Sequence, residues 1–129
     1  MNRLVCLGLL TATMATPTAA MDRSLVRQFE ELDPKTRLEQ RCDTEAMWEI
    51  NADKTSFKPD KVIAYTFADP IVDNDKMQAP GAVFRSKGEW YKLKYKCSTG
   101  PDHIEVLSFN YTIGDLIPHD EWEAHYLYP

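Results

Sequence analysis

The sequence predicts an α+β fold: two N-terminal helices packed on a three- to four-stranded antiparallel meander, a short C-terminal helix and one disulfide. Three observations lead to this fold. Between residues 22 and 52, apolar side chains recur every three or four positions, as on one face of a helix. From residue 62 onward they alternate with polar ones, as in half-buried strands. Cys42 lies in the helical part and Cys97 in the strand part.

The first twenty residues have the features of a secretory signal peptide. Arg3 provides a charged start, residues 4–10 form a short apolar run, and Thr18 and Ala20 have the small side chains of a cleavage site. The apolar run is too short to span a bilayer. Cys6 lies inside this run and not after it, which disfavours lipidation. We expect cleavage after Ala20; an uncleaved anchor is the alternative.

The remaining residues, 21–129, have the length of a single domain. Loss of Arg3 with the leader leaves 14 basic side chains against 20 acidic ones, a net charge of −6. This charge argues against a nucleic-acid partner, because phosphate binding requires a positive surface. We expect a periplasmic or secreted protein with no integral membrane segment after cleavage.

Cysteine usage gives a sharper prediction. Once Cys6 has been removed, only Cys42 and Cys97 remain, and in an oxidising compartment such a pair predicts a disulfide. In the chain-entropy model, closing the loop between them stabilises the fold by about 4 kcal/mol. A nucleophilic cysteine with a histidine, or a pair of metal ligands, is the alternative.

A first, short helix is predicted from Asp22, with Leu25, Phe29 and Leu32 on its apolar face. Either Asp22 or Ser24 is placed to accept hydrogen bonds from the first free N–H groups.

A second helix is predicted over residues 34–52. Asp33 is a suitable N-cap, and Pro34 occupies the first helical position, where its missing N–H costs nothing. Six polar side chains lie largely off the apolar stripe and are expected on a solvated face, with a charged binding face as the alternative: Arg37, Glu39, Gln40, Arg41, Glu45 and Glu49. Four side chains spaced four apart form the stripe that faces the core: Leu38, Cys42, Ala46 and Ile50.

The first strand is predicted over residues 62–68, with Tyr65 and Phe67 on one face. Residues 69–70, Asp-Pro, end it. Residues 71–81 contain two turn signals and are predicted to be irregular.

A hairpin follows, with residues 82–85 and 89–97 as strands and residues 86–88 as the turn. Residues 103–113 form the next strand of the meander. Its predicted inner face has four apolar side chains: Leu107, Phe109, Tyr111 and Ile113.

At the C-terminal end, residues 117–122 are predicted to start a short helix in which Ile117 contacts Trp122. Residues 125–129 are too aromatic for a free tail, so we expect them to pack onto the domain.

The candidate binding residues lie on the outer face of the hairpin. Lys92, Lys94 and Lys96 share one strand face with Trp90 at its head, and Arg85 lies close by on the neighbouring strand. This basic face with its aromatic ring is suited to an anionic glycan or lipid. The alternative is that the charges only keep the sheet soluble.

Residues for catalysis or for metal binding are not found. Glu121 and His125 share a helix face, but two ligands do not make a metal site. The acidic residues within 69–75 do not follow EF-hand spacing. Adjacency of Asp102 and His103 in sequence does not place the carboxylate on the imidazole. We therefore predict no metal, no cofactor and no assigned catalytic residue.

Several stretches resemble a known family. They are LDPKTRLEQRC at 32–42 with Ala46 and Met47, Phe84 with Arg85, GEWYKLKYKC at 88–97, and FNYTIGDLIP at 109–118 with Trp122. The chain resembles the bacterial domain-of-unknown-function family 930. The resemblance implies a short exported protein of Gram-negative bacteria with one cysteine in a helix, one in a strand and no assigned activity. It supports pairing of the two cysteines and transfers no catalytic residues.

We expect an exported periplasmic or envelope-associated module that binds an envelope component or a partner protein through its basic sheet face. The alternative is a small cell-envelope hydrolase-like enzyme, with His103 and Asp102 in a cleft.

Overall fold

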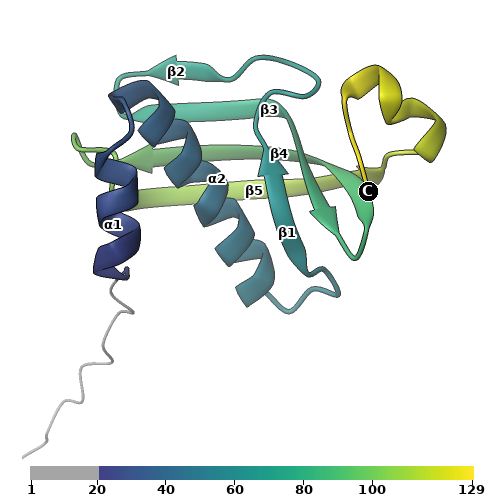
Figure 1. Ribbon diagram of the computed structural model, residues 1–129, viewed down its shortest axis with the longest axis horizontal. Coiled ribbons are helices and arrows are strands. Elements are labelled where there is room, and N and C mark those ends of the chain that lie inside the picture. The colour runs from purple at the N-terminus through teal and green to yellow at the C-terminus, as the bar shows by residue number, and fades with distance from the viewer. Residues whose placement is uncertain (1–20) are drawn as a thin grey trace, which may run out of the picture.

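The computed structural model describes residues 21–129, so the predicted signal peptide and Cys6 lie outside the described residues. Two helices, α1 (Arg23–Glu30) and α2 (Pro34–Ala52), precede an antiparallel sheet (Figure 1). The α+β class is confirmed, with five strands where three or four were predicted. The strands are β1 (Pro59–Ile63), β2 (Ile71–Asp73), β3 (Lys76–Ser86), β4 (Glu89–Thr99) and β5 (Val106–Leu116).

Both helices begin at the predicted caps. The Asp22 carboxylate accepts from the backbone N–H of Ser24 at 2.7 Å, and the Asp33 carboxylate accepts from that of Thr36 at 3.1 Å. Figure 1 shows α2 crossing one face of the sheet. Within residues 21–129, neither helix is long and apolar enough to cross a bilayer.

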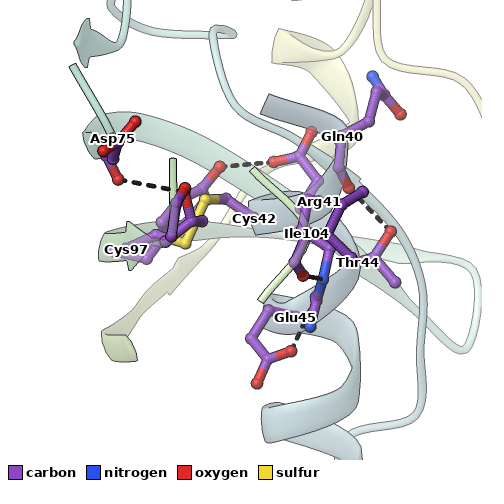
Figure 2. Close-up of a disulfide and its surroundings, with 12 residues drawn as sticks. Gln40, Arg41, Cys42, Thr44, Glu45, Asp75, Cys97 and Ile104 are labelled. Atoms are coloured by element: carbon purple, nitrogen blue, oxygen red, sulfur yellow. Dashed lines mark hydrogen bonds and ion pairs between the residues drawn. A yellow bond between two sulfur atoms is a disulfide. The ribbon is translucent and has the colours of Figure 1, made fainter. Parts of the chain in front are cut away.

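The two arginines of α2 expected in solvent are bound to the fold instead. Arg37 donates hydrogen bonds to the backbone carbonyls of three residues around the end of α1 and to that of Asp102. Arg41 is buried, donates to the carbonyl of Ile104 at 2.8 Å and pairs with Glu45 at 2.8 Å (Figure 2). The solvated-face prediction was wrong for Arg41, whereas Arg37 is half-buried. Both long side chains reach carbonyl groups that periodicity does not reveal.

The strand order is β1-β3-β4-β5, and β2 also pairs with β3. β1 pairs with the end of β3 and β2 with its beginning, so the two share one edge of that strand. Between them, β3 has an irregularity between Ala79 and Ala82, next to β4. β5 forms the opposite edge of the sheet.

The boundaries predicted for residues 62–81 were wrong. β1 ends at Ile63, and the following residues form a turn that passes over the irregularity in β3. Tyr65 is consequently exposed and does not lie in a strand. The segment expected to be irregular forms β2 and the first half of β3, joined by a tight turn in which Asn74 has a φ of 52°.

β5 begins three residues later than predicted. A register shift next to Thr99 places Val106 opposite that residue and turns Val106 toward the core. Leu107, expected on the inner face, is 63% exposed. The other three predicted inner residues pack against the core: Phe109, Tyr111 and Ile113.

The main core lies between α2 and one face of the sheet. All four residues of the predicted α2 stripe are buried there. The predicted disulfide between Cys42 and Cys97 links α2 to β4, with the two Cα atoms 6.0 Å apart (Figure 2). The helix is thus covalently fixed across the sheet.

A second, smaller cluster lies on the opposite face. The predicted C-terminal helix is replaced by two 3-10 turns, η1 (His119–Glu121) and η2 (Glu123–His125). They pack over one end of β4, and the indole N–H of Trp90 donates to the Tyr128 carbonyl at 2.8 Å. The terminal segment does pack onto the domain, but through Leu127, whereas Tyr126 and Tyr128 are exposed.

Candidate ligand-binding face

The face of the sheet opposite α2 carries the three predicted lysines. Lys92, Lys94 and Lys96 alternate along β4 with buried Leu93 and Tyr95, so their side chains point away from the main core. Alternate residues of a strand are spaced by about 7 Å, which makes the lysines an evenly spaced row. All three are exposed, and none has an ion-pair partner among residues 21–129.

A shallow groove follows this row. Two hollows of about 440 and 420 Å³ have Pro80, Lys94 and Thr112 in common and are therefore continuous. The lysines of β4 form the floor, β3 with the turn after β1 forms one wall, and β5 forms the other. Besides the shared residues, the lining includes Phe67, Gln78, Lys92, Lys96, Asn110 and Asp115.

Gly81 positions the first wall. The backbone N–H of Phe67 donates to the Gly81 carbonyl at 2.9 Å, and a Cβ atom on Gly81 would lie 2.1 Å from the backbone nitrogen of Ala68. Only glycine allows this approach. The contact holds the Phe67 ring over the sheet, with the Lys92 Nζ atom 4.9 Å from its centroid.

The second wall, on β5, has small side chains beside the lysines. A Cβ on Gly114 would lie 2.9 Å from the Lys92 Cβ, so glycine at this position leaves room for the lysine. Thr112 and Asn110 continue this wall opposite Lys94 and Lys96. The groove therefore combines cations on its floor with hydroxyl and amide groups on its wall, and with the carboxylate of Asp115 at the Lys92 end.

A third hollow, of about 380 Å³, lies beyond Phe67. The ring of Phe67 packs on that of His125, with centroids 4.4 Å apart, and His125 lines the hollow. Tyr65 and Tyr126 line it as well and are 57% and 79% exposed. Sequence reasoning missed this feature, because Tyr65 was assigned to a strand and the C-terminal residues were expected to be buried.

Comparison with known proteins identifies the family. A family model described as Domain of Unknown Function (DUF930) matches residues 29–127. The chain belongs to this family. The resemblance inferred from its sequence stretches is thereby confirmed. No curated protein and no solved structure matches this DUF930 chain.

Two of the predicted binding residues have other surroundings in the DUF930 fold. Trp90 does share a face with the lysines, but it is 2% exposed beneath the C-terminal turns. Arg85 lies 5.6 Å from the Trp90 ring centroid and makes two hydrogen bonds to Asp60, at 2.9 and 3.2 Å. The expectation of an exposed Trp90 ring was wrong, and the charge of Arg85 is already paired.

The histidine considered for catalysis has structural partners in the DUF930 chain. His103 Nε2 lies 3.0 Å from the Asp75 carboxylate and Nδ1 lies 2.7 Å from the Pro34 carbonyl. Asp102 accepts from the backbone N–H of Ile104 instead. None of the three hollows is lined by His103. No group of three metal-ligating side chains occurs within the part of the chain that the structure describes.

One acidic residue of α2, Asp43, is buried in the DUF930 domain. The Tyr95 hydroxyl donates to the Asp43 carboxylate at 2.7 Å. Burial raises the pKa of Asp43 to about 7, although the hydrogen bond from Tyr95 opposes this shift. Burial also raises the pKa of Tyr95, and the neighbouring Asp43 adds to the shift. This pair lies on the face opposite the groove and forms part of the core.

Proposed function

We propose that this DUF930 protein is an exported binding module whose groove takes an anionic component of the cell envelope. The observation that carries the proposal is the row of three lysines on the groove floor. They are evenly spaced and exposed, and they have no ion-pair partner among the described residues.

The surroundings favour a binding site over a surface that is merely solvated. A solubilising lysine needs no walls, whereas Lys92 and Lys94 line a hollow together with Phe67 and Thr112. Lys96 continues the row in the adjoining hollow. Lys92 is also held against an aromatic ring. Cations confined in a groove raise the local concentration of an anionic ligand. The overall charge is negative, so an anion would be attracted by the local charge of this face and not by the net charge of the protein.

Export is the second part of the proposal. It is supported by the signal-like first twenty residues, and the disulfide is consistent with an oxidising compartment. We expect N-terminal sequencing of protein recovered from the periplasm to begin at Met21. A chain that retains Met1 in the cytoplasm would contradict export.

Charge reversal tests the groove. We expect the triple variant K92E/K94E/K96E to weaken binding of an oligogalacturonate, measured by calorimetry, by at least roughly a hundredfold. Wild-type affinity should also fall as salt is raised, because screening weakens contacts between exposed charges.

A matched control carries the same change in net charge away from the groove. Lys35, Lys54 and Lys58 are exposed and line none of the three hollows. The variant K35E/K54E/K58E should keep most of the affinity. Equal loss in both triple variants would mean that binding follows net charge, and the groove would be discarded as the site.

A further inference from the structure

We propose that the ligand is an acidic oligosaccharide, with one sugar ring held in the hollow beyond Phe67 and its acid groups facing the lysine row. This inference rests on the proposed function and names its ligand class. It is carried by the position of the tyrosine-lined hollow at the end of the groove.

Two aromatic side chains in contact, Phe67 and His125, connect the groove to the hollow. Phe67 lines the groove and contacts Lys92 on one side, and it packs on His125 on the other. His125 in turn lines the hollow. A linear ligand that leaves the lysine row at Lys92 therefore reaches the hollow by passing the rings of Phe67 and His125.

The lining of the hollow suits a sugar ring. Tyr65 and Tyr126 are largely exposed, and each combines an apolar ring face with a hydroxyl group. A pyranose likewise has an apolar face of C–H groups and a rim of hydroxyls. Thr66 adds a further hydroxyl to the lining. Neither a phosphate chain nor an inorganic anion would use the aromatic faces.

The backbone explains why Tyr126 projects into solvent. Its φ of 56° is in the left-handed region, and the next residue turns back so that the Leu127 N–H donates to the Trp122 carbonyl at 2.9 Å. Leu127 enters the small core beside Trp90, and Tyr126 is left on the surface. The covered end of the sheet thus presents an aromatic side chain next to the basic groove.

The test compares two anionic probes that differ in the presence of sugar rings. Oligogalacturonate and linear polyphosphate of similar charge are titrated into the mature, oxidised protein by calorimetry. The variants are Tyr65→Ala and Tyr126→Ala, with Tyr128→Ala as the control. Tyr128 is 63% exposed and lines none of the three hollows.

We expect each hollow variant to weaken oligogalacturonate binding roughly tenfold and to leave polyphosphate binding unchanged. Tyr128→Ala should change neither, and Tyr65→Phe should restore most of the affinity lost in Tyr65→Ala. Thermal melts of all variants establish that they are folded.

Two results would distinguish failure of the sugar site from failure of the proposed function. Oligogalacturonate binding that is unaffected by both hollow variants but lost in K92E/K94E/K96E would refute the sugar site and leave the proposed function intact. If neither oligogalacturonate nor polyphosphate binds, the proposed function is refuted and the sugar site with it.

Discussion

Burial controls the ionisation of Asp43 more strongly than its hydrogen bond does. Asp43, a residue of α2, is 5% exposed, and burial raises the pKa of its carboxyl group from 3.8 to about 7. The folded state therefore binds a proton at pH values where the unfolded chain has released it. This group's contribution to stability is fully present below about pH 4 and is lost as the pH rises to about 7.

The substitution Asp43→Asn tests this linkage. Asparagine keeps an oxygen that accepts from the Tyr95 hydroxyl but cannot ionise. We expect the free energy of unfolding of the wild type to fall, relative to that of the variant, by on the order of 4 kcal/mol between pH 4 and pH 8. Urea unfolding at both pH values provides the measurement. If the free energy of unfolding changes with pH by the same amount in both proteins, ionisation of Asp43 does not destabilise the fold.

Single residues also show the limits of strand periodicity. The alternation in residues 89–97 correctly placed Trp90 on the same face as Lys92. Exposure of Trp90 could not be predicted, because it depends on Leu127 and other residues that return from the far end of the chain. The ion pair of Arg85 could not be predicted either. Its partner Asp60 lies 25 residues earlier, on a strand whose start was predicted too late.

At the scale of elements, both helices were predictable because their signals are local. Asp33 and Pro34 mark the start of α2, and a four-residue spacing marks its buried stripe. The edge formed by β1 and β2 was not predictable, because it follows from the irregularity in β3 around Gly81. A turn signal was seen there, but Pro-Gly within a long strand has the same local sequence as a turn between two strands.

Gly81→Ala tests the element that forms the groove wall. The added Cβ would overlap the backbone of Ala68, so the turn carrying Phe67 must move. We expect a loss of about 2 kcal/mol or more in the free energy of unfolding. Gly100→Ala is the control, because its Cβ would lie 3.5 Å from the nearest atom, an ordinary contact. Equal effects of the two substitutions would contradict the close packing of this turn.

The disulfide gives a second test at this scale. It joins positions 55 apart in sequence, so its loss frees a long loop in the unfolded chain. We expect reduction to lower the free energy of unfolding by about 4 kcal/mol and the melting temperature by roughly 20 °C. Calorimetry of the oxidised and reduced protein measures both. A melting temperature that does not respond to reductant would contradict a stabilising bridge.

The two faces of the sheet have different surroundings in the whole molecule. One face is closed by α2 and fixed to it by the bridge between Cys42 and Cys97. The other is covered at one end by the C-terminal turns and left open over the lysine row. The lysines were predictable from alternation within one strand. The groove was not, since its walls come from a turn near residue 67 and from β5, and only tertiary packing brings them beside β4.

The most direct test of the open face is a backbone NMR titration of the mature, oxidised protein with oligogalacturonate. We predict saturable shifts at the amides of Lys92, Lys94, Lys96 and Thr112, with none along the outer surface of α2. Shifts confined to α2 would contradict a binding site on this face. So would the absence of shifts at oligogalacturonate concentrations that saturate the protein in the calorimetric titration.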